Sequence, residues 1–88
     1  MTIDWSEEKN KELQIYRWVS FEDIMLALEE KRVLYAWSHP NVRKYPNQKA
    51  FVVQIDDYVY LVPYVTTWDK IFLKTIYPSR KLTKKFIK

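Results

Sequence analysis

The chain has 88 residues, 48% of them hydrophobic and 30% charged, and carries a net charge of +4 at pH 7. A chain of this length forms a single domain around one core, here residues 1–88, which excludes a two-domain enzyme. Cysteine and glycine are absent and His39 is the sole histidine, which excludes thiolate or multi-histidine metal centres, a cysteine nucleophile and glycine-rich phosphate loops. The sequence therefore predicts neither a metal nor a cofactor.

The first third of the chain predicts a short strand and two helices. Residues 2–5 form a short edge strand, and Ser6 is the N-cap of a surface helix that ends near Tyr16. Ser20 and Asp23 have the spacing of a capping box at the start of a second helix. The apolar residues of this second helix recur at helical spacing and form one face, which consists of Phe21, Ile24, Met25 and Leu28.

The remainder of the chain predicts four strands and a short terminal helix. Residues 33–37 form one strand, 50–55 and 58–65 form a hairpin across Asp56 and Asp57, and 71–77 form the last strand.

A proline within one predicted strand and a serine before the terminal helix add detail to these elements. Pro63 has no N–H to donate and indicates a sheet edge or a bulge within its strand, whereas Ser79 after Pro78 is an N-cap for the terminal helix. The predicted fold is α+β, an antiparallel sheet with the order β-α-α-β-β-β-β-α.

The charges divide unevenly along the chain. Residues 1–40 carry five basic and eight acidic side chains (5 − 8 = −3), whereas residues 41–88 carry ten and three (10 − 3 = +7). Residues 74–88 hold six basic side chains and no acid. This pattern is typical of a polyanion-binding surface, although a solvated basic helix explains it equally well.

The side chains suit metal-independent cleavage of RNA, in which the ribose 2′-hydroxyl is the nucleophile and the protein moves protons and stabilises phosphate charge. Arg80 can bind two phosphate oxygens at once. His39 is a candidate general acid or base, and a loop histidine without a catalytic role is the simpler alternative.

Two further groups of side chains suit contact with nucleic acid. Tyr45, Asn47 and Lys49 offer a stacking ring, an amide and a cation for single-stranded RNA, although proline and asparagine in residues 44–49 are also ordinary turn residues. Trp18, Trp37 and Trp68 are large apolar side chains for so small a core, so some of them are expected to be exposed. Burial is the simpler alternative for Trp37, which lies in a strand.

Three short strings carry a resemblance to a known family: Trp-Ser-Glu-Glu-Lys at 5–9, Val-Ser-Phe-Glu-Asp at 19–23 and Arg-Lys-Leu-Thr at 80–83. With the order of the elements, they make nearly the whole chain similar to the BrnT toxins, a branch of the RelE-like ribonuclease toxins of bacterial type II toxin–antitoxin systems. Arg80 matches the arginine of that family's terminal R-K motif. The register of a further family arginine falls at Lys74 or Thr75, and Lys74 is the candidate because it keeps the positive charge. Tyr16-Arg17-Trp18 departs from the family's K-H-G.

The resemblance implies a RelE/BrnT-like fold and an mRNA-cleaving toxin. It also implies neutralisation by an antitoxin, often one with a ribbon-helix-helix DNA-binding part. The resulting hypothesis is a cytoplasmic endoribonuclease without a membrane segment. Its candidate catalytic residues are Arg80, Lys74 and His39. Its candidate RNA-binding residues are Tyr45, Asn47, Lys49, Lys81 and Lys84.

Two alternatives remain open at this point. The first is a nucleic-acid-binding module that does not cut RNA, and the second is a protein adaptor that uses Trp18 and Trp68. If the chain is a toxin, an acidic segment of the antitoxin is expected to lie across the basic 74–88 surface.

Overall fold

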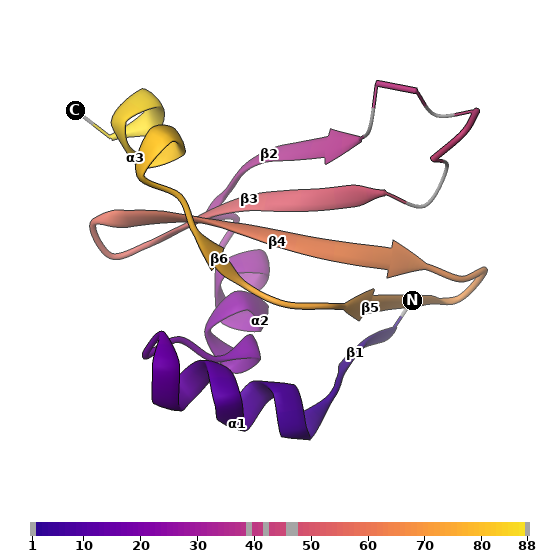
Figure 1. Ribbon diagram of the computed structural model, residues 1–88, viewed down its shortest axis with the longest axis horizontal. Helices are drawn as coiled ribbons and strands as arrows, with labels where there is room; N and C mark the ends of the chain where they lie inside the picture. The colour runs from indigo at the N-terminus through magenta and orange to yellow at the C-terminus, as the bar shows by residue number, and fades with distance from the viewer. Residues whose placement is uncertain (1, 39, 42, 46–47, 88) are drawn as a thin grey trace.

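A computed structural model describes residues 2–38, 40–41, 43–45 and 48–87 of the chain. These residues form three helices and a six-stranded sheet. Figure 1 shows how the helices and the sheet are arranged. In chain order the elements are β1 (Thr2–Trp5), α1 (Glu7–Tyr16), α2 (Phe21–Glu29), β2 (Val33–Ser38), β3 (Lys49–Ile55), β4 (Tyr58–Thr66), β5 (Lys70–Leu73), β6 (Tyr77–Pro78) and α3 (Arg80–Phe86).

The sheet is mixed, with the strand order β1-β5-β4-β3-β2 and with β6 beside β4. The α+β class, the hairpin and the antiparallel β3-β4-β5 meander are confirmed. The prediction of a purely antiparallel sheet is wrong, because β1 pairs with β5 in parallel register, Thr2 opposite Lys70. A parallel pair needs a long connection, and the two helices and three strands between β1 and β5 provide it.

The predicted strand at 71–77 is divided into β5 and β6 by residues 74–76, and Pro63 explains why. The carbonyl of Pro63 accepts a hydrogen bond from the amide of Lys74 (2.9 Å), so this residue directs its backbone groups toward the β5–β6 side. Its ring nitrogen lies on that same side and has no hydrogen to donate. The prediction of an edge or a bulge at Pro63 is therefore wrong: β4 is an interior strand that pairs with β3 in regular register, and the break lies in the neighbouring strand instead.

Helices α1 and α2 cover one face of the sheet, and the main core lies between them. Both predicted N-caps are present: Ser6 accepts from the amide of Lys9, and Ser20 forms the capping box with Asp23. Asn10 is buried in α1 and joins the helices, because its side-chain oxygen accepts from the amide of Phe21 (2.7 Å). The side chains buried in this core are Leu13, Val19, Phe21, Ile24, Ala27, Val53, Val62, Leu73 and Ile76.

Arg17, which follows α1, connects the end of that helix to the start of β6. Its guanidinium donates to the carbonyl of Ile76 and lies 5.0 Å from the centre of the Tyr77 ring. In the segment that departs from the family's K-H-G, this arginine therefore makes contacts within the fold.

Helix α3 lies on the opposite face of the sheet from α1 and α2. As predicted, Ser79 is its N-cap and accepts from the amide of Leu82 (3.1 Å). The Thr83 hydroxyl donates to the carbonyl of Ser79 (2.7 Å) and accepts from the amide of Val59 (2.9 Å), which fastens α3 to β4. None of the described helices is long and apolar enough to cross a membrane.

Among the residues that the structure describes, Trp18, Lys31 and Asp56 adopt left-handed backbone conformations, with φ values of 54°, 58° and 54°. Trp18 and Lys31 each follow the C-cap of a helix, the position at which glycine is usually found. Asp56 stands in the β3–β4 turn, where aspartate tolerates this conformation better than most residues. Because the chain has no glycine, these turns are made at some conformational cost.

Lys31→Gly is expected to raise the free energy of unfolding by about 1 kcal/mol, because glycine has no Cβ to clash in the left-handed conformation. Lys11→Gly in the middle of α1 is the matched control and is expected to lower it by about 1 kcal/mol. Urea unfolding of both variants measures the two changes. A loss of stability in both would show that φ at Lys31 imposes no strain.

Candidate functional site

The sheet face opposite α1 and α2 is only partly covered, by α3, and we call it the open face. Residues directly opposite each other in an antiparallel pair project to the same face. The register therefore places two rows of side chains on the open face: Tyr35, Val52 and Leu61, and next to them Trp37, Ala50 and Pro63.

Two adjoining hollows lie along the open face, and together we call them the groove. The first has a volume of about 460 Å³ and lies between β2 and α3, lined by Tyr35, Lys85 and Phe86 among others. The second has a volume of about 410 Å³ and reaches Lys49 and Lys74. Trp37 and Leu61 line both hollows, so the two hollows lie side by side between α3 and the end of β5.

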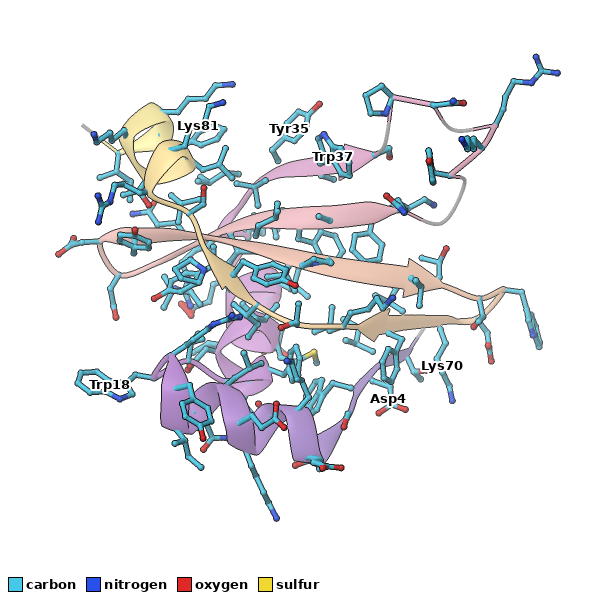
Figure 2. The ribbon with its side chains drawn as sticks, in the orientation of Figure 1. Asp4, Trp18, Tyr35, Trp37, Lys70 and Lys81 are labelled. Atoms are coloured by element: carbon cyan, nitrogen blue, oxygen red, sulfur yellow. The ribbon has the colours of Figure 1, made fainter. Side chains whose placement is uncertain are left out.

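Two aromatic rings of β2 stand at the groove. Tyr35 is 55% exposed and Trp37 is 37% exposed. Figure 2 shows both side chains on the same side of β2, with Lys81 of α3 beyond Tyr35. Burial of Trp37, the simpler alternative, is therefore wrong. Exposed rings beside cations are the combination that binds unstacked bases and phosphates.

Lysines stand at both ends of the groove: Lys85 lines it at the α3 end and Lys74 at the other. Lys49 borders the second hollow, although its register opposite Tyr64 places its side chain on the sheet face that α1 and α2 cover. Lys74 follows β5, and its amide is held by the carbonyl of Pro63. The amide of Ser79 is held by the carbonyl of Val59, four residues earlier in β4. Since a strand rises about 3.3 Å per residue, Lys74 and the start of α3 lie roughly 13 Å apart along the sheet.

The rotation of helix α3 divides its four cations into two pairs. Leu82, Lys85 and Phe86 line the groove, and Lys81 precedes Lys85 by one turn on the same flank of the helix. At 100° per residue, Arg80 and Lys84 lie on the side of α3 away from these lining residues. The structure therefore brings Lys74 to the groove, with Lys49 at its border and Lys81 beside it, and separates Arg80 and Lys84 from it.

The remaining predicted site residues lie in or beside the loop before β3. His39 and Asn47 lie outside the described residues. Tyr45 is described, and the Lys44 ammonium lies 5.5 Å from the centre of its ring, but Tyr45 does not line the groove. Sequence reasoning did not identify Tyr35 or Lys85 as site residues. The spacing of Tyr35 and Trp37, two residues apart in one strand, was a signal for a shared face.

The charged side chains among the described residues that line the groove are all basic. Among the described residues that line it, three are lysines and none is aspartate, glutamate or histidine. Tyr64 borders the second hollow, but its ring stacks on Phe51 (4.2 Å between ring centres) at the core, and burial there raises its pKa above the ordinary value of 10.0. In the described ranges, no group of three or more His, Cys, Asp or Glu side chains is placed to hold a metal ion.

Two tryptophans outside the groove are almost fully exposed. Trp18 is 89% exposed and points away from the fold beyond α1, and Trp68 is 92% exposed in the turn between β4 and β5. The expectation that some of the tryptophans are exposed is confirmed. The α1–α2 connection that carries Trp18 and the β4–β5 turn that carries Trp68 lie at opposite ends of the molecule in Figure 1, so the two rings do not form one joint surface.

Comparisons of the chain with protein-family models, with curated proteins and with solved structures found no match. The geometry of the groove and the sequence resemblance therefore carry the functional argument.

Proposed function

We propose that the open face binds single-stranded RNA and that the chain is the toxin of a bacterial type II toxin–antitoxin pair, with a RelE/BrnT-like fold, acting on mRNA in the cytoplasm. The observation that carries this proposal is the groove itself, in which Tyr35 and Trp37 stand between lysines at both ends, with no acidic side chain among the described lining residues. Stacking on aromatic rings and attraction to lysine are the two contacts that bind unpaired RNA.

Cleavage in this proposal needs no metal, because the ribose 2′-hydroxyl adjacent to the scissile phosphate is the nucleophile. Loss of its proton, attack on phosphorus and protonation of the leaving 5′-oxygen give a cyclic phosphate and a free 5′-hydroxyl. Lys74 is positioned to stabilise the charge on the phosphate oxygens. Arg80 and His39 stay predictions as catalytic groups, and the groove geometry favours Lys74 over Arg80 for the phosphate contact.

One observation favours a second function, an RNA-binding module that does not cut. The described residues that line the groove supply cations and rings but no carboxylate or imidazole to move a proton. Binding alone requires none. The two functions therefore differ in whether RNA bound at the groove is recovered intact.

The partner in this proposal is an antitoxin that neutralises the basic surface. Lys74, Lys81 and Lys85 lie at or beside the groove, and the sequence from 74 to 88 has no acid. An acidic segment of the antitoxin across this surface would exclude RNA by occupying the same cations.

The test is induced expression of the wild type, Lys74→Ala and Arg80→Ala in a bacterial host, with growth and total RNA integrity measured. Wild-type protein is expected to arrest growth and cleave RNA, and Lys74→Ala is expected to reduce cleavage about 10²-fold, as for loss of one charge-stabilising donor. Arg80→Ala is expected to have the smaller effect, because this side chain is directed away from the groove. Normal growth and intact RNA with folded wild-type protein would overturn the nuclease and leave the binding module.

A further inference from the structure

Strand β2 forms one edge of the sheet, and its second half, residues 35–38, is open to pairing with another chain. Within the described residues β2 pairs only with β3. Its sequence, Val-Leu-Tyr-Ala-Trp-Ser, contains no charge and no proline, two of the devices that prevent an edge from pairing with another chain. A third device, a bulge, is confined to the start of the strand, where the register shifts between Val33 and Tyr35, whereas residues 35–38 pair regularly with β3. Five of its six residues are exposed, including Leu34 at 37%. An edge of this kind is a template for the addition of a further strand.

The register identifies which backbone groups of β2 face outward. The amide of Gln54 donates to the carbonyl of Arg32, so Gln54 directs its backbone groups toward β2. Because this direction alternates along a strand, Ala50 and Val52 also direct their backbone groups toward β2. Their partners in β2, Trp37 and Tyr35, direct theirs toward β3. Ala36 lies between those partners and therefore presents its N–H and C=O to the open edge.

We propose that β2 binds an extended segment of a partner protein as an additional strand, and that this segment is acidic at its ends and apolar at alternate positions. Pairing through Ala36 aligns the incoming strand beside Tyr35 and Trp37. Its alternate side chains then reach the first hollow, between β2 and α3, where the lining is mostly apolar and aromatic.

Charge distinguishes this partner from a second copy of the chain. Residues 30–55, which contain β2 and both of its flanks, carry five basic side chains and one acid, Glu30, which pairs with Arg32 (3.0 Å), so this segment has a net charge of 5 − 1 = +4. In an antiparallel pair of two β2 strands, Lys31 and Arg32 of one copy would meet the segment of the other that carries Arg43 and Lys44. Like charges would oppose each other at both ends of the pair, whereas carboxylates there would be attracted.

A library of random dodecapeptides, selected on the immobilised full chain near physiological salt, tests the proposal. Enriched sequences are expected to carry Asp or Glu at their ends and β-branched or aromatic residues at alternate positions. The best peptide is then synthesised, and its affinity for the wild type, Ala36→Pro and Ala36→Ser is measured. Ala36→Pro removes the outward N–H and is expected to weaken binding about tenfold, whereas Ala36→Ser keeps it and is expected to change affinity less than about twofold.

The same variants distinguish a partner strand at this edge from a second copy of the chain and from RNA. Circular dichroism checks that Ala36→Pro remains folded, as expected because the lost N–H does not pair with β3. The proposal is overturned if nothing is enriched, if the selected peptides are basic, or if Ala36→Pro binds them as well as the wild type. A wild-type dimer in sedimentation that Ala36→Pro dissociates would assign the edge to a second copy. Affinity for an oligouridylate is expected to be unchanged in Ala36→Pro, and a tenfold loss there would assign the edge to RNA.

Discussion

Trp37→Ala is expected to weaken binding of a single-stranded RNA oligonucleotide by about 1–3 kcal/mol, roughly 5- to 150-fold, the usual contribution of one aromatic ring stacked on a base. Trp37 is chosen because it lines both hollows of the groove, so its removal interrupts the surface between Lys74 and Lys85. Fluorescence anisotropy of a labelled oligouridylate at several salt concentrations measures the change.

Trp68→Ala is the matched control, since Trp68 is 92% exposed and lies outside the groove. Its RNA affinity is expected to equal that of the wild type. The salt dependence distinguishes stacking from charge: Trp37→Ala should leave the slope of log affinity against log salt unchanged, whereas Lys74→Ala should reduce it by about one. Equal losses in Trp37→Ala and Trp68→Ala would place RNA binding elsewhere on the molecule.

Phe21→Ala is expected to lower the free energy of unfolding by about 3–5 kcal/mol, a large part of the 5–15 kcal/mol typical of a domain. Phe21 is fully buried, stacks on Trp5 with ring centres 5.7 Å apart, and begins α2 at the amide that Asn10 caps. The substitution therefore leaves a cavity where β1, α1 and α2 meet. Urea unfolding followed by far-UV circular dichroism measures the loss.

Phe72→Ala is the control for this prediction, because Phe72 lies in β5 on the open face and is partly exposed. Its expected cost is below about 1 kcal/mol, since much of the ring is already in contact with water. A similar loss of stability in both variants would mean that the buried Phe21 contributes no more to stability than the partly exposed Phe72.

The open edge of β2 and the groove are adjacent, and this has a consequence for the proposed toxin. A strand added to β2 would place its side chains beside Tyr35 and Trp37, where RNA is proposed to stack. A partner bound at the edge would thereby block the RNA site without covering Lys74. Such a partner and a stacked RNA are expected to compete, which a displacement titration with the selected peptide measures.

The site was predicted from the sequence only in part. Lys74 and Lys49 were identified, the first through its register in the family resemblance and the second through the composition of its loop, and the structure places Lys74 in the groove and Lys49 at its border. Arg80 was preferred on its position in a motif. The rotation of α3 about its axis, which directs Arg80 away from the groove, depends on the packing of Leu82 and Phe86 against the sheet. No pattern within a seven-residue helix determines that packing.

The sequence by itself determined the local features of this protein: the caps at Ser6, Ser20 and Ser79 and the turn at Asp56. These depend on hydrogen bonds and backbone preferences among residues a few positions apart. Tertiary structure alone decided the parallel pairing of β1 with β5, the edge position of β2 and the groove between β2 and α3. Each joins segments distant in the chain, and the energy of such contacts comes from surfaces that meet only when the sheet has formed.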